Sequence, residues 1–336
     1  YPNIARLKKY TYKSSIFCNI AVRYKNNENG KITIRNFEKV NIGSIPIMVH
    51  SKRCILRGLD DVKLGELGEC PYDQGGYFII NGKEKVIISQ EIKVNNIVYI
   101  NDSSEDNIIL QANIKSVSKE GFQSSRTNMI TLESIKINTD DVYKVKRILV
   151  RVLGFDIKVP LMIMFRALGL QTDKDIINAI IRSTDPEPIK RKLNYLLRIS
   201  MKDSQPIYTQ KDALRLLAMN TKGKDIINVI DILNNNLFPH YISYQEKYTF
   251  LAYIVRKLLL THLGIIPHTD RDSYSNKRVD LAGSLLLELY RELWGIFKKN
   301  LSLKLDYEFK SINKSLLQDE KNLINIINDN NLNVIF

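Results

Sequence analysis

The clearest structural signal in this 336-residue sequence is the segment Gly75-Gly76-Tyr77-Phe78-Ile79-Ile80-Asn81-Gly82-Lys83-Glu84-Lys85-Val86-Ile87-Ile88. Two runs of β-forming residues flank the dipeptide Asn81-Gly82. A two-residue type I′ turn requires positive φ at both central positions, and Asn-Gly tolerates that conformation well. The segment therefore predicts a β-hairpin with Asn81 and Gly82 at its tip.

The sequence around this hairpin divides into a β-rich first part and a helix-rich second part. Short β-forming runs occur at 16–22 and 31–34, separated by the turn cluster 26–30, and residues 130–137 alternate between apolar and polar. Amphipathic spacing then predicts helices at 160–170, 172–182, 187–200, 209–219, 223–236, 244–263 and 279–300, and a helical tail from about 310. Gly169 is expected to end the first of these helices, and Thr172 to cap the second. This pattern indicates an α+β chain of two or three folding units.

The composition excludes several classes of protein. Hydrophobic residues make up 44% of the chain and charged residues 26%, which is typical of a globular protein. Three separated cysteines exclude a disulfide scaffold, and no apolar run is long enough for a membrane span. The sequence opens on Tyr1 without an initiator Met or a signal-like region, so we expect a chain cut from a longer one.

The net charge of +14 suggests a polyanionic partner. Long-range attraction favours nucleic acid for a chain of this size and charge. A solubilising charge spread over the surface is the competing interpretation, because no long Lys/Arg block marks a nucleic-acid arm.

Metal and thiol chemistry find little support in the sequence. The four histidines, His50, His240, His262 and His268, do not have metal-ligand spacing and none pairs with a Cys-x-x-Cys motif. Cys70 has no visible base in the sequence, so we expect a half-buried structural cysteine.

The most polar stretch is His268–Asp280, and three interpretations of it stay open. Asp270 and Asp272 could hold Mg²⁺ together. Arg271 and the pair Lys277-Arg278 could instead neutralise these acids in a salt-bridged loop before a helix, with Asp280 in the first turn of that helix. In the third interpretation, the loop contacts phosphates through its cations, and the carboxylates orient them.

Two further basic stretches have both a functional and an ordinary interpretation. The segment 124–128 places small hydroxyls around Arg126, which suits a phosphate contact but is also typical of a solvated turn. The run from Lys144 to Arg151 is basic, and a solvated face explains it equally well.

Four segments in order along the chain resemble the second-largest subunit of eukaryotic-type multisubunit DNA-directed RNA polymerases. Glu69–Glu91 contains a Gly-Gly-Tyr-Phe-Ile-Ile-Asn-Gly core similar to the family motif, followed by Glu-Lys-Val and Gln-Glu. The other three are the Pro-Ile-Met segment and its Cys in 45–54, the Phe-Arg-Ala-Leu-Gly element in 159–169, and the Asp-Arg-Asp…Lys-Arg…Asp-Leu-Ala-Gly signature in 270–283. The last departs from the family pattern, because Thr269 replaces an acidic residue and Ser273-Tyr274-Ser275 replaces His-Phe-Gly.

The resemblance implies a fold and a domain order. In this family a lobe domain is inserted in a protrusion domain, so the chain leaves the protrusion and returns to it. We therefore expect protrusion residues at 1–92 and 278–336, and the lobe at 93–277. The protrusion is expected to be a mixed, β-rich domain and the inserted lobe to be largely helical. The Ile, Asn and Lys bias suggests a divergent version, such as one from a giant virus.

The resemblance also implies a function. The family transcribes DNA into RNA, and its protrusion and lobe form one side of the DNA cleft, near the template DNA and the RNA–DNA hybrid. The catalytic Mg²⁺ belongs to the largest subunit, so this chain is expected to hold no catalytic residue, metal or cofactor of its own. Expected partners are the largest subunit, other polymerase subunits, DNA, the hybrid and initiation factors, without a membrane. Expected locations are the nucleus for a cellular version, and the virion and infected-cell cytoplasm for a viral one.

The residues expected to contact nucleic acid are all cationic: Arg126, Arg271, Lys277, Arg278, Lys83 and Lys85. Three other functions remain as alternatives at this stage. They are a stand-alone, non-enzymatic DNA-binding protein with the same architecture, a metal-dependent phosphodiester enzyme using Asp270 and Asp272, and an assembly module whose basic surface meets acidic proteins.

Overall fold

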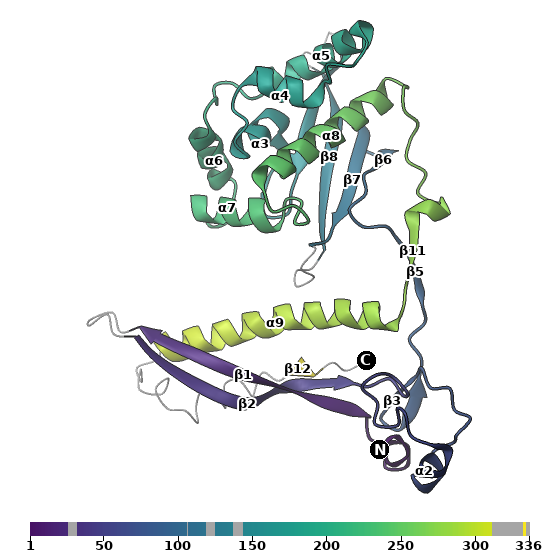
Figure 1. The fold of residues 1–336 in the computed structure, drawn as a ribbon. Coiled ribbons are helices and arrows are strands. Elements are labelled where there is room, and N and C mark those ends of the chain that lie inside the picture. Colours follow the sequence, from purple (N-terminus) through teal and green to yellow (C-terminus); the bar gives the residue numbers. More distant parts are fainter. Residues whose placement is uncertain (26–31, 106, 119–124, 137–143, 311–331, 334–336) are drawn as a thin grey trace. The chain divides into compact units, whose positions relative to one another are not determined.

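The computed structural model describes residues 1–25, 32–105, 107–118, 125–136, 144–310 and 332–333. Figure 1 shows a mixed α+β chain, which confirms the predicted fold class. The chain divides into two compact units, the first formed by Tyr1–Gln90 with Val279–Phe336 and the second by Glu91–Arg278. The predicted turn at 26–30 and most of the predicted helical tail lie outside the described residues.

A long antiparallel hairpin, β1 (Lys13–Lys25) and β2 (Ile32–Pro46), dominates the first unit. The helix α9 (Ala282–Lys310) runs along this hairpin (Figure 1), and β12 (Leu332–Asn333) adds to β2 in parallel. The hairpin buries the apolar residues Phe37, Val40 and Ile42 against Trp294, Leu301 and Leu305 of α9. The apolar side chains of α9 therefore hold it on one face of the hairpin.

A second, smaller core of the first unit lies around the predicted hairpin, which is present as β3 (Phe78–Ile80) and β4 (Lys83–Lys85). Asn81 and Gly82 have φ values of 51° and 77°, as the predicted turn requires. A Cβ on Gly82 would lie 2.7 Å from the Cα of Lys9, so this position also needs glycine for close packing. The short helices of this region are α1 (Pro2–Leu7) and α2 (Asp61–Glu66), and its core residues are Ala5, Val49, Cys54, Leu56, Leu64 and Ile79.

The second unit is built on a five-stranded antiparallel sheet with the order β10-β9-β8-β7-β6. The strands are β6 (Tyr99–Asp102), β7 (Ile108–Ser116), β8 (Arg126–Lys136), β9 (Lys144–Arg151) and β10 (Val159–Pro160). Ala112, Ile130 and Val150 lie in register on neighbouring strands and are fully buried. The predicted alternation at 130–137 thus falls on β8 as far as Lys136, with Ile130 and Leu132 buried in the core.

Six helices complete this core: α3 (Leu161–Ala167), α4 (Asp173–Ile180), α5 (Glu187–Lys202), α6 (Gln210–Met219), α7 (Ile226–Asn235) and α8 (Tyr244–His262). Gly169 follows α3 at a φ of 102°, and the side chain of Thr172 accepts a hydrogen bond from the Asp175 amide, as the sequence predicted. The helix α8 buries Leu251, Ile254 and Leu258 completely.

The region predicted as a helix from residue 279 differs in the structure. Residues Lys277–Asp280 form β11, which pairs with β5 (Gln90–Lys93), and α9 begins only at Ala282. Asp280 therefore ends a strand and does not lie in the first helical turn. Pairing with a strand almost 190 residues away left no local signal in the sequence.

Candidate nucleic-acid interface

The polar loop 268–278 is fixed to the sheet of the second unit at several points. The Thr269 amide donates to the Ile100 carbonyl over 3.2 Å, and the Ile100 amide donates to the Thr269 hydroxyl over 3.3 Å. The Tyr99 hydroxyl and the Val94 amide both donate to the carbonyl of Asn276, over 3.3 and 3.0 Å. Thr269, which departs from the family pattern, thus has a structural role at the edge of β6.

Asp270 serves the internal geometry of the loop through its carboxylate and its carbonyl. The Asp272 amide donates to Asp270 Oδ1 over 2.9 Å, and Asn276 Nδ2 donates to the Asp270 carbonyl over 2.7 Å. Across the described ranges, no group of three or more His, Cys, Asp or Glu residues is placed to hold a metal ion. The arrangement of Asp270 and Asp272 is that of a hydrogen-bonded turn.

Lys277 and Arg278, at the end of this loop, have different hydrogen-bond partners. Lys277 Nζ lies 2.8 Å from Glu91 Oε1 and 4.0 Å from Asp272 Oδ1, and the hydrogen bond to Glu91 raises the pKa of the lysine. Arg278 is exposed, and its Nη1 donates to the carbonyls of Ser275 and Lys277. Since only one nitrogen of the Arg278 guanidinium is used in these bonds, the rest of the group can meet an external anion.

The other predicted contact residues lie elsewhere. Arg271 is half-buried in the same loop, whereas Lys83 and Lys85 are exposed on β4 of the first unit. Arg126 is the first residue of β8, so the expected solvated turn at 124–128 is a strand from Arg126 onward. Arg271, Lys277 and Arg278 therefore belong to the same segment, 268–278. Lys83 and Lys85 belong to the first unit.

The end of the sheet that carries Arg126 contains unusual buried polar atoms. Asn128 and Ser116 are both 0% exposed, and Arg126 is paired in register with Ser116. Arg126 Nε, Ser116 Oγ and both polar side-chain atoms of Asn128 have no hydrogen-bond partner in the described structure. Because buried polar atoms are normally satisfied, this is an unusual cluster of unpaired polar atoms at the start of β8.

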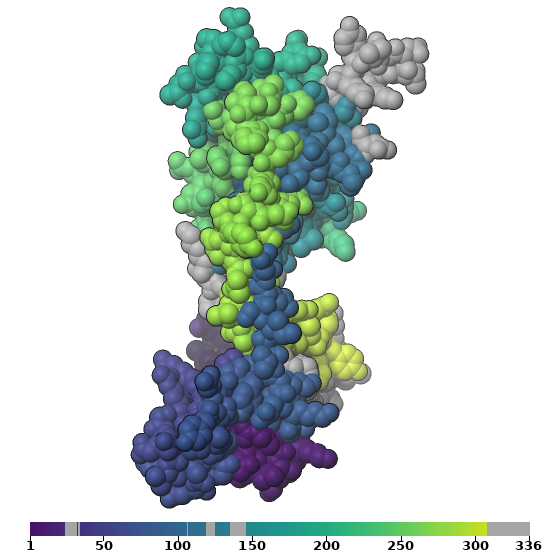
Figure 2. Space-filling view, turned by 90° about the vertical axis from the view of Figure 1, so that its right-hand side faces the viewer, coloured from purple at the N-terminus to yellow at the C-terminus, as the bar shows by residue number. Residues whose placement is uncertain are grey.

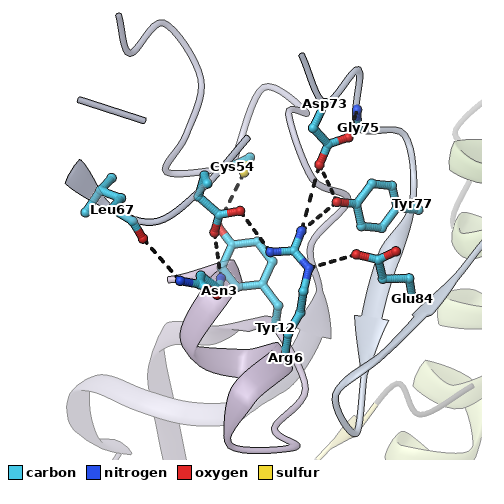
Figure 3. Close-up of polar contacts among 10 residues, drawn as sticks. Asn3, Arg6, Tyr12, Cys54, Leu67, Asp73, Gly75, Tyr77 and Glu84 are labelled. Carbon is cyan, nitrogen blue, oxygen red and sulfur yellow. Dashed lines mark hydrogen bonds and ion pairs between the residues drawn. The ribbon is translucent and has the colours of Figure 1, made fainter. Parts of the chain in front are cut away.

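Several cations of the chain form ion pairs and hydrogen bonds within the fold, so they are not available to nucleic acid. Arg6 of α1 is the centre of a network in the first unit (Figure 3), with Glu69 and Glu84 each at 2.8 Å and the Tyr77 hydroxyl at 2.6 Å. Tyr77 also donates to Asp73, and burial together with this bond raises the pKa of Tyr77 to about 12. Burial alone would raise the pKa of Asp73, but the hydrogen bonds from Tyr77 and Gly75 outweigh it and lower the pKa. Three charged residues of the Glu69–Glu91 motif, Glu69, Asp73 and Glu84, thus belong to the Arg6 network of the first unit.

Arg166 of the Phe-Arg-Ala-Leu-Gly element is buried in the second unit, with 1% exposure. Its guanidinium donates to the carbonyls of Gln171, Ser204 and Ile207 and to the carboxylate of Asp173. The ring of Tyr208 lies 5.2 Å below the guanidinium carbon. Arg166 therefore ties α3 to α4 and to the segment that follows α5.

Two cations of α8 have similar internal roles. Arg256 binds the Asp185 carboxylate with both terminal nitrogens, and this bond lowers the pKa of Asp185. Lys247 is 0% exposed, and its Nζ donates to the carbonyls of Leu233 (2.6 Å) and Asn234 (2.8 Å) at the end of α7. Burial lowers the pKa of Lys247 to about 8.

The basic run on β9 is only partly a solvated face. Lys146 Nζ lies 2.7 Å from Nε2 of His262, so the imidazole is a neutral acceptor. Burial, and then the nearby charge of Lys146, lower the pKa of His262. Arg147 binds Glu133, which Lys158 also contacts at 2.7 Å, while Arg151 is exposed.

The structure also corrects the expectation for Cys70. Cys54 is the buried cysteine, whereas Cys70 is exposed beside the buried Glu69. Neighbouring residues do not distinguish the two cysteines, because each has charged residues before it and apolar residues after it in the sequence.

Comparison with known proteins identifies the family. The RNA polymerase beta subunit family matches residues 1–328. DNA-directed RNA polymerase II subunit RPB2 of Encephalitozoon cuniculi is 37% identical over 311 residues, which cover 89% of this chain and 26% of that protein. DNA-directed RNA polymerase II subunit 2 of Arabidopsis thaliana is 36% identical over 313 residues, covering 88% of this chain and 26% of the relative. DNA-directed RNA polymerase III subunit RPC2 of Saccharomyces cerevisiae is 28% identical over 341 residues, covering 98% and 27%.

The chain belongs to the RNA polymerase beta subunit family, as its four motifs predicted. It spans about a quarter of the length of the curated relatives it matches. Within the described residues, none of the helices combines the length and the apolar character that crossing a membrane requires.

Proposed function

We propose that this chain is part of the second-largest subunit of a DNA-directed RNA polymerase and forms one side of its DNA cleft. The observation that carries the proposal is the family match, which runs through both structural units from residue 1 to residue 328. The relatives named above are polymerase II and polymerase III subunits, and the net charge of +14 suits a template-facing position.

The first unit corresponds in this proposal to the protrusion and the second to the lobe. The support is the chain path, because residues 91–278 form one compact unit inserted between two segments of the other. The chain supplies binding surface and no catalytic residue. The Mg²⁺ needed for nucleotide addition is expected on the largest subunit, with no cofactor held by this chain.

DNA contact in this proposal is made through phosphates and is independent of sequence. Arg278 and Arg271 are the best placed in the loop, while Lys277 is already neutralised by Glu91 and orients β11. Arg126, Lys83 and Lys85 are further candidates. The partners are the largest subunit, other polymerase subunits, initiation factors, template DNA and the RNA–DNA hybrid. The location follows the polymerase: the nucleus in a cell, or the virion and infected-cell cytoplasm for a virus.

The test is to purify the protein that carries this sequence from its native source at low salt and to identify its partners by mass spectrometry. We expect it to co-purify with a largest polymerase subunit, and the purified fraction to elongate RNA on a DNA template. The proposal would be overturned if the protein purified without other polymerase subunits and its fractions showed no RNA synthesis.

A further inference from the structure

The outward face of α5 carries a regular row of cations around one aromatic ring. Arg191, Tyr195, Arg198 and Lys202 follow one another at spacings of four, three and four residues. Residues at these spacings lie on the same side of an α-helix. The rise of 1.5 Å per residue makes this row roughly 16 Å long.

Packing on the opposite side of α5 fixes which face points outward. Leu193, Leu196 and Leu197 are buried in the core of the second unit, and the Ser200 hydroxyl accepts a hydrogen bond from the Ile148 amide of β9. Arg191, Tyr195, Arg198 and Lys202 are all exposed. Figure 2 shows teal atoms, the colour range to which α5 belongs, over the upper part of the second unit. The helix therefore presents a fixed row of side chains to solvent.

The cations of this row form no ion pairs with acidic side chains of the described residues. The helix contains five Lys or Arg residues and one acid, Glu187, which pairs with Lys190 at 3.0 Å. For Arg191, Lys192, Arg198 and Lys202, the described structure contains no ion pair with an acidic side chain. This distinguishes them from Arg166, Arg256 and Arg6, whose charges are satisfied internally.

Tyr195 indicates which polyanion suits this row. Its side chain is 75% exposed in the middle of the row, where burial in the protein does not explain an aromatic residue. An exposed aromatic ring between cations is the arrangement that stacks on unpaired bases while the cations meet the backbone phosphates. A duplex keeps its bases inside the helix, and an acidic peptide offers nothing that requires a ring at this position.

We propose that the α5 face formed by Arg191, Lys192, Tyr195, Arg198 and Lys202 binds single-stranded nucleic acid. This site is separate in the sequence from the 268–278 loop, and it stands whether or not the chain works within a polymerase. DNA and RNA strands offer the same phosphates and bases, so the experiment must distinguish them.

The test uses the full 336-residue chain and fluorescence anisotropy with labelled dT20, rU20, a 20-base-pair duplex and polyglutamate, over a range of NaCl concentrations. The first variant is the triple change Arg191→Gln, Arg198→Gln and Lys202→Gln. Its matched control removes the same charge elsewhere on the second unit, through Lys174→Gln, Lys211→Gln and Lys222→Gln, which are all exposed. The second variant is Tyr195→Ala, with Tyr195→Phe as its conservative partner.

We expect dT20 or rU20 to bind more tightly than the duplex and polyglutamate, and the tighter of the two single strands to identify the source. The α5 triple variant should lose at least tenfold in affinity and lower the slope of log K against log salt by about 2, since each phosphate contact contributes about 0.7 for a single strand. Tyr195→Ala should lose about fivefold or more without a change of slope, and Tyr195→Phe should retain binding, because stacking requires the ring. Equal losses in the two triple variants, tighter binding of duplex or polyglutamate, or unchanged binding by Tyr195→Ala would each overturn the proposal.

Discussion

Arg6 in the first helix and Glu69, 63 residues later, form an ion pair of 2.8 Å in which the Glu69 side chain is only 4% exposed. The same guanidinium binds Glu84 and the Tyr77 hydroxyl. This single side chain therefore connects the start of the chain to the first residue of the Glu69–Glu91 motif and to the hairpin within it.

Arg6→Ala should destabilise the first unit by about 2–4 kcal/mol, because it leaves the carboxylate of Glu69 buried without its cation. The only tryptophan of the chain, Trp294, packs on the β1–β2 hairpin, so its fluorescence during urea unfolding reports this unit. Lys63→Ala, which removes an exposed pair with Asp60, is the control and should change stability by less than about 1 kcal/mol. Similar midpoints for Arg6→Ala and the wild type would contradict the role of the network.

Gly82→Ala should destabilise the same unit by about 1–3 kcal/mol, because the new methyl group would meet Lys9 and the residue would remain at positive φ. Gly65→Ala is the matched control, since a Cβ at this position in α2 meets no atom within 4 Å. It should stabilise the unit by roughly 0.5–1 kcal/mol. Trp294 fluorescence in urea measures both, and equal effects of the two changes would contradict the close packing at the turn.

Arg166→Lys should destabilise the second unit by about 3 kcal/mol or more, because an ammonium cannot replace a guanidinium that serves three carbonyls and a carboxylate in one plane. Helical circular dichroism during urea unfolding follows α3 to α8 of this unit together with α9 of the first unit, and Trp294 fluorescence in the same samples identifies the transition of the first unit. Arg215→Lys, at an exposed pair with Asp212, serves as the control and should stay within about 1 kcal/mol of the wild type. If both changes have equally small effects, the buried Arg166 contacts do not stabilise the unit.

Acidification should weaken the second unit through His262. Burial and Lys146 lower the pKa of this histidine in the folded chain. Below the ordinary pKa of about 6.5, the unfolded chain therefore binds more protons at this residue than the folded chain does. Stability is therefore fully present above pH 6.5 and falls as the pH decreases through that value, by at most about 1.4 kcal/mol per pH unit for one proton.

The measurement is urea unfolding by circular dichroism between pH 5 and pH 8. His262→Gln should reduce the pH dependence, because glutamine does not titrate, whereas His268→Gln, at an exposed position, should leave it unchanged. An identical pH dependence in His262→Gln and the wild type would show that the Lys146–His262 contact does not act in this way.

Arg271→Glu combined with Arg278→Glu should weaken retention of DNA by the assembled polymerase and make it more sensitive to salt, because two phosphate contacts become repulsive. Lys277→Gln should have a smaller effect on DNA, since Glu91 already neutralises Lys277. The readout is the fraction of complexes that keep their DNA at increasing NaCl. Unchanged retention by the double variant, in a complex that assembles normally, would contradict the loop contacts.

Local signals in the sequence were sufficient for much of the fold. The Asn81-Gly82 turn, the Thr172 cap and Gly169 after α3 each depend on a few neighbouring residues, and each is present. The strand β11 was missed because it exists through pairing with β5, which is distant in the sequence.

The candidate sites were harder to predict, because the availability of a cation depends on its three-dimensional partners. The sequence shows Arg166 and Lys277 only as cations and does not show their partners, yet one is buried and the other is paired with Glu91. The row on α5 shows the opposite case. Its spacing was readable in the sequence, but only the burial of Leu193 and Leu197 reveals that the cations face outward together.

The bonds between Val94 and Asn276, and between Glu91 and Lys277, have a consequence for how such a chain can evolve. They hold the first and last residues of a 188-residue insertion side by side. The two chain segments at the junction are therefore as close together as the two strands of a short hairpin. Loop length then adds little to the entropic cost of closing the host fold. An inserted domain with adjacent ends can be enlarged, trimmed or exchanged while the surrounding unit keeps its own chain path, which makes the second unit a natural place for new surfaces to arise.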